Sequence, residues 1–217
     1  MKGLLKKDLA LLRNTGKAYL VIVLIELIFG LFNKEMQSFT MGFATIMISM
    51  AGLSTLSYDD FENGILFLMS LPVSRKTYIR EKYLFCFLCG VAGWLISLVL
   101  AVAVFGKTLL GSDFFIAEAS CFLTTAGVMT AVMISARIRF GPEKSRVVGM
   151  AIIMVLCILG YVGKFIIDAL SVDVDVLIRA GQRLPDSWIL LGIIGIYVLV
   201  MLISYLYSVH VFEKKEF

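Results

Sequence analysis

The stretch that decides the fold is YDDFENGILFLMSLPVSRKTYIREKY, from Tyr58 to Tyr83. It holds four acids and four bases around a Leu–Pro step, whereas the chain on either side runs for roughly twenty residues with hardly a charge. Twenty apolar residues are about the length that a helix needs to cross a bilayer. A polar segment between two such runs is typical of a loop between two membrane spans.

The composition favours the same class of protein. Of the 217 residues, 60% are hydrophobic and 17% are charged, and the mean hydropathy is +0.95. A soluble domain usually carries about a quarter charged residues. All four cysteines fall in apolar segments, and neither a second Cys pair nor a His lies near Cys86-x-x-Cys89. We interpret them as small apolar residues of helices rather than as a metal or redox site.

Six apolar segments predict six transmembrane spans, at residues 17–32, 38–57, 83–105, 115–136, 147–167 and 187–210. Backbone polar groups in a bilayer must be satisfied internally, so the spans are helices or strands of a closed barrel. Blocks such as VIVLIELIFGLF lack the strict alternation of barrel strands. We therefore expect an all-α integral membrane protein, with residues 1–217 forming a single transmembrane domain.

The distribution of basic residues predicts the orientation. Fifteen of the twenty Lys and Arg residues lie in the N-terminal segment, in loops 58–82 and 137–146, and at the C-terminus. Cytoplasmic loops carry the excess of Lys and Arg in membrane proteins. We expect both termini and these two loops in the cytoplasm. The net charge of +4 follows from this topology, and no nucleic-acid partner is expected.

Residues 1–16 repeat leucine at helical spacing, at Leu5, Leu9 and Leu12, among several lysines. This pattern predicts an interfacial amphipathic helix, with leucines in the acyl boundary and lysines toward anionic headgroups. A plain positive flank of the first span is the alternative. A cleavable signal peptide is not expected, because the segment lacks an uninterrupted apolar core.

A short helix is predicted in the 58–82 loop. Phe61, Ile65 and Leu68 fall at positions i, i+4 and i+7, which favours an amphipathic helix over residues 59–70. Pro72 ends it, since the residue before a proline avoids the α region. Asp59, Asp60 and Glu62 would occupy its first turn, where carboxylates favour the positive end of the helix dipole. A membrane protein has no packing need for this element, so we expect a cytoplasmic partner; an ordinary connecting loop is the alternative.

Two further features remain open. Glu26 lies in the middle of the first span, where an ionisable group costs about 2.5–3.5 kcal/mol on insertion scales. It could face a translocation path, lie at a dimer interface, or reach water through a tilt of this short span. Loop 168–186 is acidic early and basic late, and we expect a short outer-leaflet helix or a packed connector there.

The segment FENGILFLMSLPVSRKTYIREKY, after an apolar run that ends in LSTLSYDD, resembles the cytoplasmic coupling region of ABC-2-type transporter permeases. The C-terminal YLYSVHVFEKKEF also resembles that family. In length and number of spans the chain is similar to small six-span permeases of bacterial peptide exporters, such as the phenol-soluble modulin exporters. The resemblance implies a multi-pass permease of the bacterial cytoplasmic membrane that exports peptides or other amphipathic compounds. It further implies a second permease subunit, alike or unlike, and two copies of an ATPase subunit.

The resemblance also assigns site residues by position. The ATPase-coupling residues are Asp59, Asp60, Phe61, Glu62, Ile65, Leu68, Leu71, Pro72 and Arg75. Loop 137–146 is a second, smaller contact, with Arg139, Glu143 and Lys144. Charge reversal at Asp59, Asp60 and Glu62 is expected to uncouple ATP hydrolysis from transport while the fold is kept.

No G-x-x-x-x-G-K-[ST] phosphate loop occurs in the sequence, so ATP and Mg²⁺ are expected on the partner ATPase and no cofactor on this chain. A membrane-embedded enzyme needs clusters of His, Asp or Glu at membrane depth. With His210 as the only histidine and Glu26 as the one clearly intramembrane acid, the sequence does not indicate an enzyme. A non-transporting partner of an ABC-type ATPase, such as an immunity or sensor subunit, remains an alternative.

Overall fold

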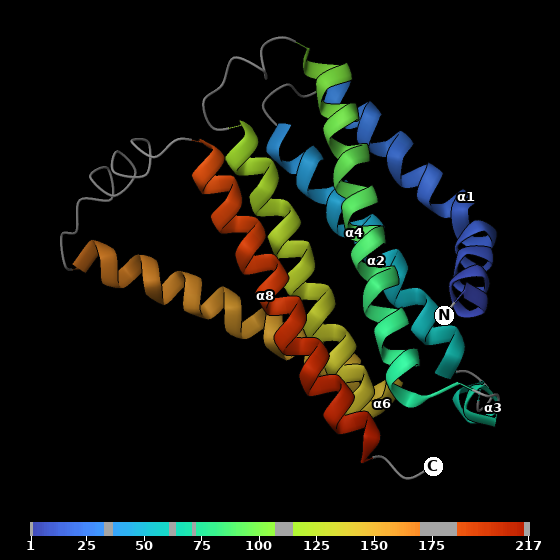
Figure 1. Ribbon diagram of the computed structural model, residues 1–217. Coiled ribbons are helices and arrows are strands. Elements are labelled where there is room, and N and C mark those ends of the chain that lie inside the picture. Colours follow the sequence, from blue (N-terminus) through green and yellow to red (C-terminus); the bar gives the residue numbers. More distant parts are fainter. Residues whose placement is uncertain are drawn as a thin grey trace.

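The computed structural model describes residues 2–32, 37–60, 64–70, 73–106, 115–169 and 186–214, which form helices and no strand (Figure 1). The helices are α1 (Lys2–Phe32), α2 (Gln37–Asp60), α3 (Gly64–Ser70), α4 (Arg75–Phe105), α6 (Phe115–Ala169) and α8 (Asp186–Glu213). Within these residues, four stretches are long and apolar enough to cross a membrane: Met41–Asp60, Arg75–Val104, Ala119–Ile152 and Leu191–Glu213. The all-helical membrane architecture is thus confirmed for the described chain.

The remaining predicted spans correspond to parts of longer helices. Residues 17–32 form the second half of α1, which runs without a break across residue 16, where the sequence predicts a boundary. Figure 1 shows that α1 changes direction along its length. Its buried face carries Leu4 and Asp8, whereas Leu9 of the predicted leucine stripe is 61% exposed. The N-terminal segment is therefore packed into the protein through a different face from the one the leucine repeat predicts.

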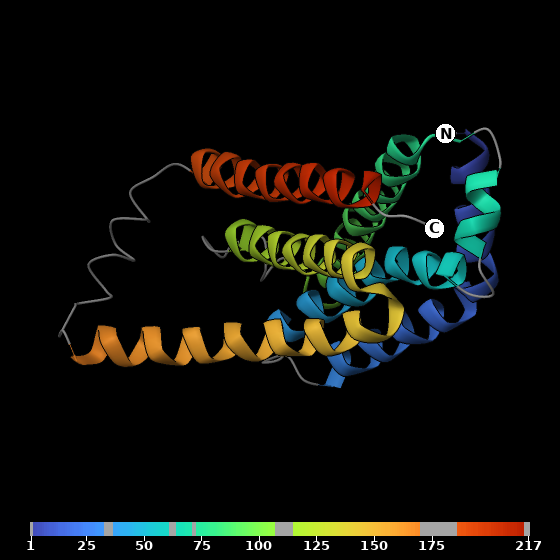
Figure 2. The same ribbon diagram turned by 90° about the horizontal axis from the view of Figure 1, so that it is seen from below.

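Helix α6 combines the fourth and fifth predicted spans as two arms that meet at a sharp turn. Gly141 holds φ 80° and ψ 178° there, a conformation essentially reserved for glycine. Pro142 follows and cannot donate a helical hydrogen bond. In Figure 2 the first arm lies between α8 and the second arm. The Gly–Pro pair of loop 137–146 is thus a turning point inside helical backbone.

Small residues let α2 pack closely along α4. A Cβ atom on Gly52 would lie 2.9 Å from Cys86 Cα, and one on Gly93 would lie 2.9 Å from Ile48 Cβ. Close approach of this kind is how small residues strengthen helix association in membranes, where burial from water supplies little. Cys86 and Cys89 are buried free thiols on α4.

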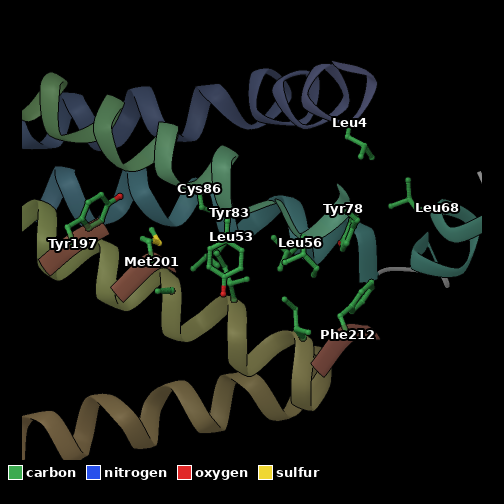
Figure 3. Packing of buried hydrophobic residues seen from close by; sticks show 14 of the residues in the cluster. Leu4, Leu53, Leu56, Leu68, Tyr78, Tyr83, Cys86, Tyr197, Met201 and Phe212 are labelled. Carbon is green, nitrogen blue, oxygen red and sulfur yellow. The ribbon is translucent and has the colours of Figure 1, made fainter. Parts of the chain in front are cut away.

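The apolar core gathers side chains from all six described helices, and five of these helices meet at one end of the bundle. Leu4 of α1, Leu68 of α3, Tyr78 of α4 and Phe212 of α8 converge there with Leu56 of α2 (Figure 3). The rings of Tyr78 and Phe212 stack with centroids 5.6 Å apart. Both chain ends, α3 and the turn of α6 lie toward this same end (Figure 1). Among the described residues, the N-terminal segment, the 58–82 segment, the 137–146 turn and the end of α8 therefore share one end of the bundle.

Candidate functional site

Asp59 and Asp60 are the last two residues of α2, not the first turn of the short helix. The prediction of one helix over residues 59–70 is wrong at its start, because α2 continues through both acids and α3 begins only at Gly64. Carboxylates at a helix C-terminus oppose its dipole, so they need cations nearby. The structure supplies those cations from other helices. Phe61 and Glu62 lie outside the described residues.

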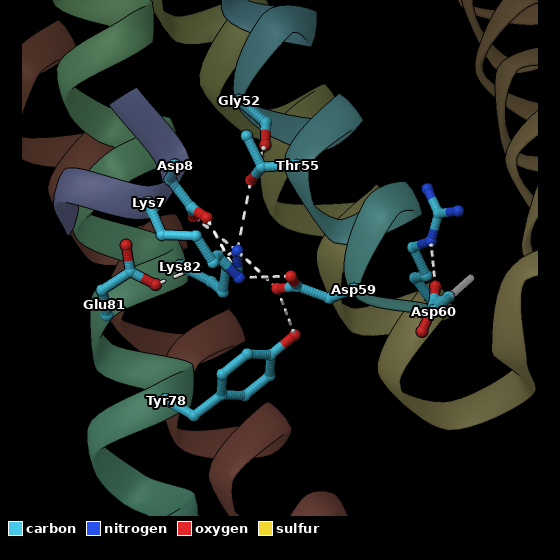
Figure 4. A network of polar contacts seen from close by, with 10 residues as sticks. Lys7, Asp8, Gly52, Thr55, Asp59, Asp60, Tyr78, Glu81 and Lys82 are labelled. Carbon is cyan, nitrogen blue, oxygen red and sulfur yellow. Dashed lines mark hydrogen bonds and ion pairs between the residues drawn. The ribbon is translucent and has the colours of Figure 1, made fainter. Parts of the chain in front are cut away.

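Asp59 lies at the centre of a buried network of charges (Figure 4). Its side chain is 5% exposed, and its Oδ2 lies 2.7 Å from Lys82 Nζ of α4. The same oxygen accepts a hydrogen bond of 3.1 Å from the Tyr78 hydroxyl. Lys7 of α1 pairs with Oδ1. The end of α2 is thereby joined to both α1 and α4.

Lys82 makes the second half of this network. Its side chain is fully buried and pairs with Asp8 of α1 as well as with Asp59. It also donates to Thr55 Oγ1 at 3.3 Å, and Lys7 Nζ lies 3.3 Å from Asp8 Oδ1. A lysine is almost never fully buried unless it is paired, since desolvation of the ammonium is costly. Two lysines and two aspartates thus form a closed set across three helices.

Glu81 is a buried acid at the edge of this set. Its side chain is fully buried, and the nearest cation, Lys82 Nζ, lies 4.0 Å away. Neither of its carboxyl oxygens has a hydrogen-bond partner among the described residues. The cluster therefore contains one more acid than base.

Asp60 connects the end of α2 to a fourth helix, α6. Its Oδ2 lies 2.8 Å from Arg137 Nε on α6, and both side chains are largely buried, at 14% and 15% exposed. Arg137 precedes the turn at Gly141 by four residues. The junction between α2 and α3 is thus linked by ion pairs to α1, α4 and the turn of α6. Charge reversal at either aspartate would break buried pairs, so we now expect such variants to lose stability as well as coupling.

Helix α3 packs inward two of the residues that the resemblance assigns to ATPase coupling, Ile65 and Leu68. Leu68 is buried in the core, and Ile65 packs against it. Phe67 is 68% exposed. Because GILFLM is apolar nearly all round, its periodicity could not tell which residues face out. Ile65 and Leu68 hold the helix to the bundle, and Phe67 is a large apolar side chain that it exposes.

Arg75 joins the start of α4 to the end of α8. Its guanidinium donates to the carbonyl oxygens of Glu213 at 2.8 Å and Phe212 at 3.4 Å. A cation at a helix C-terminus is favourable for the dipole and satisfies free carbonyls. Lys76 adds an ion pair of 3.2 Å to the Glu213 side chain, and Ser74 caps α4 by accepting from the Thr77 N–H. Leu71 and Pro72 lie outside the described residues.

The predicted second contact lies around the turn of α6. Arg139, Glu143 and Lys144 are all exposed there. Arg139 donates to the hydroxyl of Tyr207 on α8, and its guanidinium carbon lies 5.2 Å from the centre of the Phe140 ring. These residues therefore share an end of the bundle with α3.

Glu26 lies outside the charge cluster. It is 18 positions beyond Asp8 on α1, which is about 27 Å along a helix. Its side chain is 3% exposed, and Oε2 has no hydrogen-bond partner among the described residues. It is covered by protein and does not reach water by a tilt of the span. A place on a translocation path or at a dimer interface stays a prediction.

Sequence reasoning assigned no site role to several residues of this network: Lys7, Asp8, Thr55, Tyr78, Glu81, Lys82 and Arg137. The bases among them were counted only as markers of orientation. Asp8, a lone acid in a strongly basic segment, was the available signal. Pairing across 52 or 74 positions of sequence cannot be read from one chain.

Comparison with protein families gives one match that covers nearly the whole chain. The model of the ABC-2 family transporter proteins matches residues 3–213. Comparison with curated proteins found no match, and neither did comparison with solved structures. The similarity to modulin exporters therefore stays a prediction. Since the family match spans nearly the full length and agrees with the all-helical membrane architecture, the chain belongs to the ABC-2 family of transporter proteins.

Proposed function

We propose that this chain is the permease subunit of an ATP-driven exporter in the bacterial cytoplasmic membrane, and that it moves peptides or other amphipathic compounds out of the cell. Membership of the ABC-2 family supports a role as the membrane component of an ABC transporter and implies an ATPase partner. The observation that carries the proposal is α3, a short helix that exposes Phe67 and follows the end of α2, which buried ion pairs anchor.

The proposed topology has six spans with both termini in the cytoplasm. The second half of α1 and the two arms of α6 would supply the spans beyond α2, α4 and α8. The gathering of both chain ends, α3 and the α6 turn at one end of the bundle supports this topology (Figure 1). So does the excess of Lys and Arg in the same segments.

The charge cluster gives the coupling a physical route. The ATPase would bind α3 through Phe67, and movement of α3 would pull on the last turn of α2. Asp59 would pass that movement to α1 and α4 through Lys7 and Lys82, and Asp60 would pass it to α6 through Arg137. Breaking a buried ion pair is costly, so the four helices would move together. Arg139, Glu143 and Lys144 would form the smaller second contact.

The assembly that this route serves has two permease chains and two ATPase chains. The second permease chain is either a copy of this one or a related subunit, and ATP and Mg²⁺ bind the ATPase. Export of peptides or other amphipathic compounds is inferred from the similarity to six-span peptide exporters.

Co-purification and transport test the proposal. The chain is expressed with candidate ABC ATPases and extracted in detergent, and the complex is expected to contain permease and ATPase in equal numbers. Reconstituted in liposomes, it should move a fluorescent amphipathic peptide across the bilayer only with ATP and Mg²⁺. An ATPase that binds but drives no peptide would instead support the non-transporting partner. Absence of any ATPase from the purified chain would refute the permease role.

A further inference from the structure

An apolar groove runs between α4 and α8 on the side of the bundle. It has a volume of about 570 Å³, and its lining includes Leu84 and Phe87 of α4 and Val198 and Leu202 of α8. Leu84, Val198 and Leu202 are 40%, 42% and 56% exposed, so the groove opens outward. Long exposed apolar surface on a membrane helix faces lipid chains. The groove is a hollow in that surface.

One cation stands at the end of this groove. Arg80 lines it one turn before Leu84 and is exposed. The neighbouring cations on α4 are engaged, since Lys76 pairs with Glu213 and Lys82 lies in the buried cluster. No hydrogen bond or ion pair joins Arg80 to the described residues. An uncompensated guanidinium beside an apolar hollow favours an anion with an apolar tail.

We propose that the groove binds one anionic phospholipid of the cytoplasmic leaflet. Its phosphate would accept from Arg80, and an acyl chain would lie along Leu84, Phe87, Val198 and Leu202. The planar fork of an arginine suits a phosphate group, and basic pockets between membrane helices on the cytoplasmic side bind anionic headgroups. The choice of leaflet rests on the proposed cytoplasmic orientation of this end of the bundle.

The polar content of the groove disfavours an extended peptide as its occupant. A peptide backbone carries a donor and an acceptor at nearly every residue, and each must be satisfied away from water. The Tyr83 hydroxyl, which also lines the groove, is already bonded to Ser204 at 2.6 Å and Ser208 at 2.7 Å. An acyl chain has no hydrogen-bonding groups to satisfy. A phospholipid therefore fits the groove, with its phosphate at Arg80 and its acyl chain along the apolar lining.

The test uses the full chain, purified without its ATPase, delipidated in detergent, and titrated separately with phosphatidylglycerol and phosphatidylcholine while native mass spectrometry counts bound lipids. Arg80→Gln removes the cation, and Arg146→Gln removes an exposed arginine of α6 that does not line the groove. Val198→Trp fills the groove, and Leu199→Trp adds the same bulk at an exposed neighbour outside the lining.

The unchanged chain is expected to bind phosphatidylglycerol about fivefold more tightly than phosphatidylcholine, the worth of one basic residue near a membrane surface. Arg80→Gln should abolish this preference, and its control Arg146→Gln should keep it. Val198→Trp should bind neither lipid, whereas its control Leu199→Trp should bind both. Equal effects of the two arginine variants would overturn the proposal. So would a chain dimer that Val198→Trp dissociates, since the groove would then hold a second copy. The measurement needs no ATPase, so its failure is separate from failure of the permease role.

Discussion

The ammonium nitrogen of Lys82 lies 2.7 Å from the carboxylate of Asp59, with the lysine fully buried and the aspartate almost so. One residue belongs to the start of α4 and the other to the last turn of α2, on either side of the short helix α3. The two ends of the polar segment 58–82 are therefore fastened to each other inside the protein. The segment 58–82, which the sequence predicts to be a cytoplasmic loop, is therefore held at both ends by a buried ion pair.

Replacing Lys82 with Met should destabilise the protein strongly. The change leaves Asp8 and Asp59 buried without their shared cation, and breaking a buried pair from one side typically costs about 3–5 kcal/mol. Thermal unfolding of the purified chain in detergent measures the loss. Lys76→Met is the control, because its pair with Glu213 is exposed at 66% and 44% and should change stability by about 0.5 kcal/mol or less. Equal melting temperatures for the two variants would argue against the buried network.

Gly141→Ala should strain the turn of α6. At φ 80° and ψ 178° a Cβ atom is strongly disfavoured, at a cost of about 1–3 kcal/mol. Gly16→Ala in the middle of α1 is the matched control, since nothing lies within 4 Å of its added Cβ and alanine favours a helix. Unfolding midpoints of the two variants should therefore shift in opposite directions. A shift of the same sign in both would contradict the turn.

Tyr83→Phe should remove a buried polar junction between α4 and α8. The hydroxyl is within 2.7 Å of both Ser204 and Ser208. Because Ser204 keeps other partners, including the Ala131 carbonyl, we expect a loss of about 1 kcal/mol. Tyr161→Phe is the control, with a side chain 76% exposed. Unfolding in detergent distinguishes them, and an unchanged Tyr83→Phe midpoint would refute the junction.

Phe67→Ala should weaken coupling to the ATPase without unfolding the chain, since its ring is 68% exposed on α3. Leu68→Ala next to it should instead lower stability, by about 2 kcal/mol or more, because Leu68 is buried in the core. ATPase activity of the purified complex and thermal unfolding of the permease give the two readouts. Phe67→Leu should retain most of the coupling. The assignment fails if Phe67→Ala complexes hydrolyse ATP and transport peptide as before.

Local sequence patterns were enough to predict the membrane class and most of the spans. They also predicted that the N-terminal segment and the 58–82 and 137–146 segments lie on the same side. Runs of apolar residues such as 83–105 and 187–210 can satisfy their backbone only as helices in a bilayer, so no tertiary information was needed. The turn at Gly141 and Pro142 is also local in origin, because both residues act on their own backbone.

The sequence by itself thus determined an all-helical membrane protein with a polar, basic segment between apolar helices, since helix formation in lipid depends on neighbouring residues alone. Only the tertiary structure decided that Asp59 and Asp60 end α2, that Lys82 and Asp8 pair with each other inside the protein, and that Phe67 rather than Leu68 faces outward. These are choices of partner among residues up to 77 positions apart. They depend on how α1, α2, α4 and α6 pack, because a buried charge takes whichever opposite charge that packing brings within reach.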